Sequence, residues 1–169
     1  MPDNVDMDKP QFYEDLASEL APLLSGERHW MANAANTAAL LFLRLQRTNW
    51  VGFYFLDGDE LILGPFQGEP ACTRIAIDRG VCGAAVRQQR TLVVPDVHRF
   101  AGHIACDAAS NSEVVVPIRH QDRLLGVLDI DSPDLHRFDA ADGTGLERIV
   151  AVYCNATDFD MSALPGGPC

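Results

Sequence analysis

The sequence predicts an α+β protein, in which helices near both ends of the chain flank a central antiparallel sheet. Three observations predict this class. Apolar residues recur at helical spacing near the two ends, strand-like segments fill the middle, and turn residues separate neighbouring strands. The predicted elements run as two helices, three strands, a helix, three strands and a helix, which is typical of an antiparallel sheet with segregated helices.

Helical periodicity begins close to the N-terminus. Phe12, Leu16 and Leu20 lie four residues apart and predict an amphipathic helix that ends near Ser25. Asp139 is expected to cap the last helix, with Asp142 completing an acidic first turn. The four helices are expected at residues 12–25, 27–45 and 80–87, and from residue 140 onward.

Six short segments predict strands, and turn residues join two pairs of them into hairpins, at Asp57-Gly58 and at His120-Gln121-Asp122. Residues 95–112 show no periodic pattern, and a loop of this length inside a compact domain is usually functional. The strands are expected at residues 49–56, 60–64, 73–77, 91–94, 113–119 and 124–131.

The chain length of 169 residues and a hydrophobic content of 47% indicate one domain with a buried core. We expect a flexible N-terminus over 1–10, a single catalytic domain over 11–160 and a flexible C-terminal tail over 161–169. The net charge of −11 argues against binding to nucleic acid or to anionic membranes. With no signal peptide and no long apolar run, the protein is expected to be soluble and cytoplasmic.

The first candidate binding feature is a pair of aromatic residues on one strand. Strand alternation places Trp50, Gly52 and Tyr54 on the same face. Because glycine has no side chain, we expect a space between the two aromatic rings that suits a small apolar group. The alternative is that both aromatic side chains simply belong to the core.

A second candidate feature is a group of carboxylates. Alternation places Leu125, Val127, Asp129 and Asp131 on one face, which puts the two carboxylates about 6–7 Å apart. Glu113 opens the neighbouring strand and is expected to join them. Clustered carboxylates raise one another's pKa values and bind an ammonium group well. The alternative interpretation of Asp131 is a polar turn residue.

Three of the five cysteines, Cys72, Cys82 and Cys106, lie in or beside loops. The chain has no C-x-x-C pair, so a structural disulfide framework is not expected. Cys82 is expected at a helix N-terminus, where the dipole favours a thiolate. A Cys₃His zinc site is the competing interpretation, but spacings of 10 and 24 between these cysteines differ from the close pairs of structural zinc sites. We therefore expect no metal, and the absence of nucleotide-binding glycine motifs predicts no cofactor.

Several segments resemble known families. Val116-Pro117-Ile118, Leu125-Gly126-Val127-Leu128-Asp129 and Phe138-Asp139 resemble the C-terminal half of GAF domains. Gly80-Val81-Cys82-Gly83 and Gly102-His103-Ile104-Ala105-Cys106-Asp107 are similar to one branch, the free methionine-(R)-sulfoxide reductases, and the resemblance extends over residues 12–155. Ala101 stands where that motif has proline.

The resemblance implies a GAF-like fold and the thiol-dependent reduction of free L-methionine (R)-sulfoxide. It places the sulfenic acid on Cys106, with Cys72 or Cys82 as the resolving cysteine, although the helix-terminal position favours Cys82 as the more acidic thiol. Thioredoxin as reductant and a homodimer are further implications. Trp50 and Tyr54 would enclose the substrate methyl group, while Glu113, Asp129 and Asp131 would bind its ammonium group. The alternative function is a GAF sensory module that binds a small ligand without catalysis.

Overall fold

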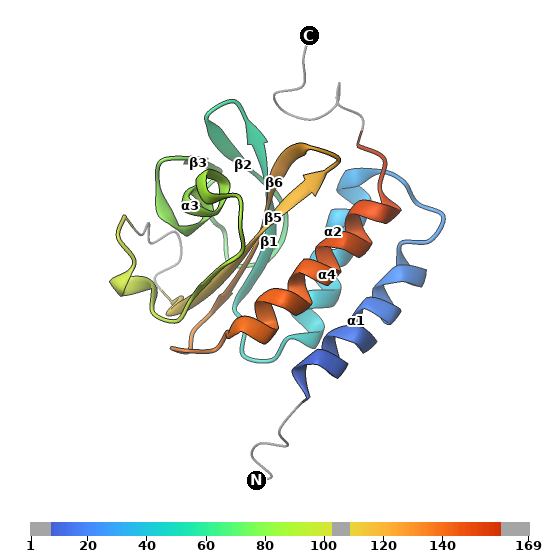
Figure 1. Ribbon diagram of the computed structural model, residues 1–169, viewed down its shortest axis with the longest axis horizontal. Helices are drawn as coiled ribbons and strands as arrows, with labels where there is room; N and C mark the ends of the chain where they lie inside the picture. The colour runs from blue at the N-terminus through green and yellow to red at the C-terminus, as the bar shows by residue number, and fades with distance from the viewer. Residues whose placement is uncertain (1–7, 103–108, 160–169) are drawn as a thin grey trace.

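A six-stranded antiparallel sheet forms the centre of the computed structural model, which describes residues 8–102 and 109–159 (Figure 1). Helices cover both faces of this sheet. The helices are α1 (Lys9–Leu23), α2 (Trp30–Arg44), α3 (Gly80–Gln88) and α4 (Ala140–Ala156), with a short 3₁₀ helix at Val97–Arg99. The strands are β1 (Trp50–Asp57), β2 (Glu60–Gly68), β3 (Arg74–Ala76), β4 (Leu92–Val94), β5 (Ser112–His120) and β6 (Arg123–Ser132).

The strand order is β3-β2-β1-β6-β5-β4, so both predicted hairpins are confirmed. Strand β1 pairs with β6 in antiparallel orientation and joins the two halves of the sheet. This pairing sets Gly52 opposite Asp129 and Trp50 opposite Asp131. Residues far apart in the sequence therefore become neighbours at the middle of the sheet.

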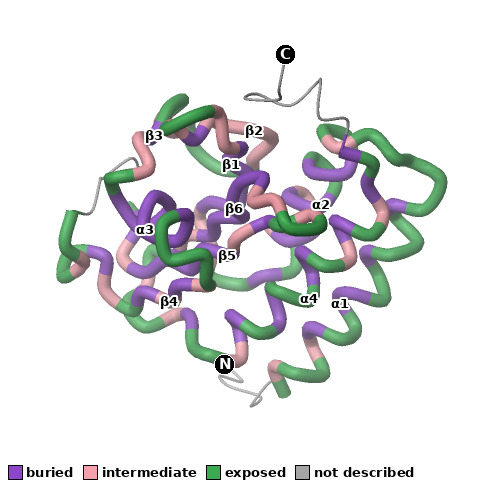
Figure 2. Tube along the Cα trace, turned by 45° about the horizontal axis from the view of Figure 1, so that its top comes forward, coloured by how far each residue is buried: buried purple, intermediate pink, exposed green. Residues whose placement is uncertain are grey.

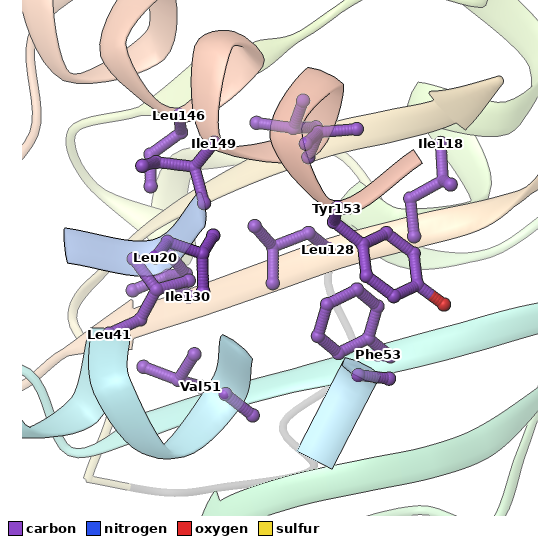
Figure 3. Packing of buried hydrophobic residues seen from close by; sticks show 14 of the residues in the cluster. Leu20, Leu41, Val51, Phe53, Ile118, Leu128, Ile130, Leu146, Ile149 and Tyr153 are labelled. Carbon is purple, nitrogen blue, oxygen red and sulfur yellow. The ribbon is translucent and has the colours of Figure 1, made fainter. Parts of the chain in front are cut away.

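Helices α1, α2 and α4 pack on one face of the sheet and bury the larger core (Figures 1 and 2). Figure 3 shows Leu20 and Leu41 from the first two helices near the sheet residue Ile130, and Tyr153 from α4 beside the sheet residue Phe53. The alternation of the strand explains why these helices meet apolar side chains, because Val51, Phe53 and Phe55 all point to this face.

Helix α3 lies on the opposite face and covers a second, smaller core. This core includes Trp50 and Tyr54 of β1, and Val115 and Val127 of the central strands, together with Cys82 of α3. The predicted separation of Trp50 and Tyr54 from Val51, Phe53 and Phe55 is confirmed, because the two sets belong to different cores.

A buried carboxylate ties α1 to α4. Asp142, whose side chain is 2% exposed, accepts a hydrogen bond of 2.9 Å from the Tyr13 hydroxyl and forms an ion pair of 2.6 Å with Lys9. Asp142 also completes a capping box with Asp139, so the predicted N-cap is confirmed. Helix α1 already begins at Lys9, and residues 9 and 10 therefore belong to this helix and not to a flexible N-terminus.

Two expectations about the strands are wrong. Strand β2 continues to Gly68, past the end predicted at residue 64, and an irregularity in its pairing with β1 absorbs the Gly-Pro step. Leu125 lies at a bulge, because Ile118 pairs with Gly126 and Arg119 with Leu124. The bulge turns Leu125 into the larger core, away from the face that carries Asp129.

Within 8–102 and 109–159, no helix has both the length and the apolar character that crossing a bilayer requires.

Candidate active site

Two neighbouring strands, β5 and β6, bring the predicted acidic residues together on the α3 face. In the pairing of β5 with β6, Glu113 lies opposite Asp131, and Asp129 lies opposite Val115. Glu113 and Asp129 are buried, with 6% and 7% of their surfaces exposed, while Asp131 is half-buried. The prediction that these three carboxylates share one site is consistent with this register.

Helix α3 brings a thiol to the same place. Gly83 allows the helix to approach closely, because a Cβ atom at this position would lie 2.7 Å from the carbonyl oxygen of Ile77. Cys82 lies in the first turn, is 4% exposed, and its thiol donates a hydrogen bond to Glu113 Oε1 at an Sγ–Oε1 distance of 4.0 Å. We refer to Cys82, Glu113 and Asp129 as the thiol–carboxylate cluster.

Burial is the largest influence on the pKa values of the two carboxyls in this cluster. Removal from water raises the pKa of Glu113 well above its usual range, and the neighbouring Asp129 and Asp131 charges raise it further. Burial also raises the pKa of Asp129 to about 6, although hydrogen bonds with Cys82 and Glu113 partly offset the effect. Burial therefore favours the protonated form of the Glu113 carboxyl, beside an Asp129 carboxyl whose pKa is about 6.

The expected acidity of Cys82 is wrong. Burial raises the pKa of its thiol well above the ordinary value, and the Asp129 and Glu113 carboxylates act in the same direction. The helix N-terminus favours a thiolate only weakly by comparison, because two carboxylates face the buried sulfur. Cys82 is a neutral thiol with a hydrogen-bond donor directed at Glu113.

The aromatic residues line the cluster in a different way from the one expected. Trp50 and Tyr54 stack with ring centroids 5.8 Å apart, and Phe66 also stacks with Trp50 at 5.4 Å. A Cβ atom on Gly52 would lie 2.3 Å from the Trp50 ring, so the indole itself fills the space that the glycine leaves. The space expected above Gly52 is therefore occupied by the Trp50 ring, and both aromatic rings are part of the second core.

Phe66 was not among the predicted site residues. It follows Pro65 in a segment with the composition of a loop, so strand periodicity gave no indication of it. The glycine opposite Phe66 in β1 is the one sequence feature that indicates a large ring nearby, because Gly52 pairs with Phe66 across the sheet.

Cys72 lies beside this aromatic group. The Tyr54 hydroxyl donates a hydrogen bond of 2.9 Å to the carbonyl oxygen of Cys72. Cys72 is disulfide-bonded, whereas Cys82 and Cys154 carry free, buried thiols. The predicted nucleophile Cys106 lies outside the described residues.

Known proteins resemble the chain along most of its length. Residues 11–156 match the GAF domain family. The free methionine-R-sulfoxide reductase of Escherichia coli is 52% identical over 145 residues, which are 86% of this chain and 88% of that protein.

Solved structures agree in fold as well as in sequence. The free methionine-R-sulfoxide reductase from Neisseria meningitidis, solved in complex with its substrate, superimposes with a TM-score of 0.84 at 43% identity and covers 88% of this chain and 90% of that one. The reduced form of fRMsr of Staphylococcus aureus gives a TM-score of 0.82 at 53% identity, with coverage of 85% and 94%. The antiparallel sheet, the buried acidic cluster and this similarity together establish that the chain belongs to the GAF domain family and, within it, to the free methionine-R-sulfoxide reductases.

Proposed function

We propose that this protein is a cytoplasmic oxidoreductase that reduces free L-methionine (R)-sulfoxide to L-methionine, through a cysteine sulfenic acid and an intramolecular disulfide that thioredoxin reduces. One observation carries the proposal. Glu113, whose carboxyl has a strongly raised pKa, lies in one buried cluster with Asp129, in a chain 52% identical to a reductase of that name.

The two protonation states suit the two ends of the substrate. Glu113, held neutral by burial, donates a hydrogen bond to the sulfoxide oxygen and then its proton as the S–O bond breaks. Asp129 and the half-buried Asp131 supply negative charge for the substrate ammonium group. A methionine inside a polypeptide has no such ammonium group, which is why the free amino acid is the preferred substrate.

The aromatic residues supply the apolar part of the site. Trp50 and Tyr54 stack on each other within the second core, on the side of the sheet that carries the cluster, and both are 2% exposed. The substrate methyl group packs against these rings, so that a chiral sulfur directs its oxygen to Glu113 in one epimer only.

The thiol chemistry proceeds in two balanced steps. The Cys106 thiolate attacks the sulfoxide sulfur and takes up its oxygen, which leaves methionine and a cysteine sulfenic acid. The thiol of the resolving cysteine then attacks this sulfenic acid, which forms a disulfide and releases water.

Cys72 is the better supported resolving cysteine. It is disulfide-bonded, whereas Cys82 is free and its thiol has a raised pKa that disfavours attack. A dithiol such as that of thioredoxin restores both thiols by exchange.

Family resemblance also implies a homodimer, which sedimentation equilibrium of the purified chain tests.

A substrate comparison tests the proposal. With dithiothreitol as reductant, the protein is expected to consume half of racemic free methionine sulfoxide and to leave the S epimer. N-acetylation of the substrate is expected to lower the rate by about two to three decades, because it removes an ion pair in a buried site. Equal rates on free and N-acetylated substrate, or full consumption of the racemate, would show that the assignment is wrong.

Single-turnover assays separate the roles of the cysteines. Without added reductant, Cys106→Ser is expected to release no methionine, while Cys72→Ser releases one equivalent and fails to turn over with thioredoxin. Cys154→Ser is the matched control, since its thiol is also buried but lies in the other core. Methionine release by Cys106→Ser would exclude Cys106 as the nucleophile.

A further inference from the structure

The thiol–carboxylate cluster contains three potential metal ligands from three different elements. One ligand atom each from Cys82, Glu113 and Asp129 can be chosen so that all three lie within 4.8 Å of one another, and all three residues are buried. None of the ion pairs among the described residues involves Glu113 or Asp129.

A second observation points to a missing partner in this cluster. Asp129 Oδ1 is buried and accepts no hydrogen bond from any described residue. A buried carboxylate oxygen without a donor is unfavourable, because it has lost its hydrogen bonds to water and has no protein donor in their place. A cation beside Oδ1 would remove this cost.

We propose that the thiol–carboxylate cluster is a binding site for one Zn²⁺-like cation, and that the cation competes there with the substrate. One sulfur and two carboxylate oxygens form a donor set suited to Zn²⁺ and to its softer analogue Cd²⁺. Three protein ligands leave a fourth position open for water. The competition rests on the proposed function, whereas the metal site itself rests only on the cluster.

The geometry requires a small contraction. Bond lengths of about 2.0–2.3 Å in a tetrahedral site place ligand atoms roughly 3.4–3.6 Å apart. The Sγ–Oε1 distance from Cys82 to Glu113 is already 4.0 Å. The three ligand atoms, which now lie within 4.8 Å of one another, therefore move closer together around the cation, and the thiol proton leaves to the solvent as the sulfur becomes a ligand.

This site differs from the Cys₃His arrangement considered from the sequence. Cys72 is disulfide-bonded and cannot act as a ligand, whereas the free thiol of Cys82 persists beside this disulfide. The proposed site is therefore complete in the oxidised protein. Mg²⁺ is not expected to compete, because it prefers six oxygen ligands in octahedral geometry.

Cadmium titration of the oxidised protein tests the site directly. The expected result is an ultraviolet thiolate-to-cadmium charge-transfer band that saturates at one equivalent of Cd²⁺. For a site with three protein ligands, we expect a Kd on the order of 1 µM. Cys82→Ser is expected to lose the band, and Cys154→Ser, which removes the other free buried thiol, to keep it. Asp129→Asn is expected to keep the band and weaken binding at least about tenfold, which tests the site even where Cys82→Ser does not fold.

A competition experiment tests the overlap with substrate. Free L-methionine (R)-sulfoxide is expected to raise the apparent Kd for Cd²⁺ in proportion to its concentration, while the N-acetylated compound has no effect. The absence of a band at one equivalent, or a band that Cys154→Ser loses and Cys82→Ser keeps, would overturn the metal site. A Cys82-dependent band that substrate leaves unchanged would overturn the competition. If the metal-free protein does not reduce the sulfoxide at all, the proposed function fails while the band still reports the metal site.

Discussion

At the scale of single residues, the proposed chemistry depends on the protonation states of three neighbouring weak acids. Cys82 and Glu113 both have raised pKa values because they are buried beside negative charge, and Asp129 remains the most acidic of the three. The result is a proton donor and an anion within a few ångströms of each other. This pairing would not exist for these side chains in water at neutral pH, where both carboxyls would be ionised.

The buried carboxylates lower the free energy of unfolding. The raised pKa of Asp129 gives the size of this effect for one of them. The pKa of Asp129 is about 6 in the folded protein, compared with an ordinary value of 3.8. Between these values the folded state binds more protons than the unfolded state, so the free energy of unfolding falls as the pH rises through this window. Ionisation of Asp129 therefore lowers the free energy of unfolding by about 2–3 kcal/mol, and the full loss is reached above pH 6.

We therefore predict that Asp129→Asn stabilises the protein more at pH 7.5 than at pH 4. Urea denaturation at both pH values should show the difference between variant and parent growing by about 2–3 kcal/mol, while the variant loses activity. Asp59→Asn, at an exposed position in the β1–β2 turn, is the matched control and is expected to show no such growth. A constant difference between pH 4 and pH 7.5 would contradict the raised pKa.

At the scale of elements, helix α3 is the part that completes the site. Its first turn carries Cys82 and is held close to the segment before it by Gly83, where a Cβ atom would also lie 2.9 Å from the carbonyl carbon of Ile77. Backbone atoms cannot move aside as a flexible side chain can. The distance from α3 to the sheet, and with it the contact between Cys82 and Glu113, depends on the absence of this side chain.

Gly83→Ala is accordingly expected to destabilise the protein by about 1–3 kcal/mol, although alanine is intrinsically the better helix former by about 1 kcal/mol. The single-turnover rate of methionine release should fall with it, because α3 moves away from Glu113. Gly143→Ala is the control within another helix, where a Cβ would meet only side-chain methyl carbons at 3.3 and 3.4 Å. The free energy of unfolding of that variant should equal or exceed that of the parent. If the two variants show the same change in the free energy of unfolding and in the single-turnover rate, the role assigned to Gly83 is wrong.

The elements also show which parts of the structure a sequence can predict. Alternation is a local property, so it correctly assigned Trp50 and Tyr54 to one face and Phe53 to the other. It was wrong for Leu125, because the bulge arises from the register of the neighbouring strand. The acidity of Cys82 was wrong for a similar reason, since a helix N-terminus is visible in the sequence but the carboxylates that face it come from β5 and β6.

At the scale of the whole molecule, the sheet separates two cores that differ in size and in role. The larger core lies under α1, α2 and α4, and the smaller one under α3 contains the thiol–carboxylate cluster. Among the described residues, each core holds one free and buried thiol, Cys154 in the larger and Cys82 in the smaller. These two thiols report independently on how each side of the sheet opens.

We predict that the α3 side opens with a smaller free energy than the whole molecule. In the proposed function, substrate must reach Glu113 and Asp129, which are only 6% and 7% exposed, and α3 is a helix of nine residues over the smaller core. Labelling of Cys82 by a thiol reagent, followed in Cys154→Ser, should therefore proceed at low urea with a weak dependence on urea concentration. Labelling of Cys154, followed in Cys82→Ser, should require global unfolding and show the full dependence, because the slope scales with the surface exposed. Each rate is corrected by the rate for the same chain in denaturing urea, which removes differences in intrinsic thiol reactivity. Equal opening free energies and equal urea slopes for the two thiols would mean that the sheet and its two layers open only as one unit, and that substrate enters by another route.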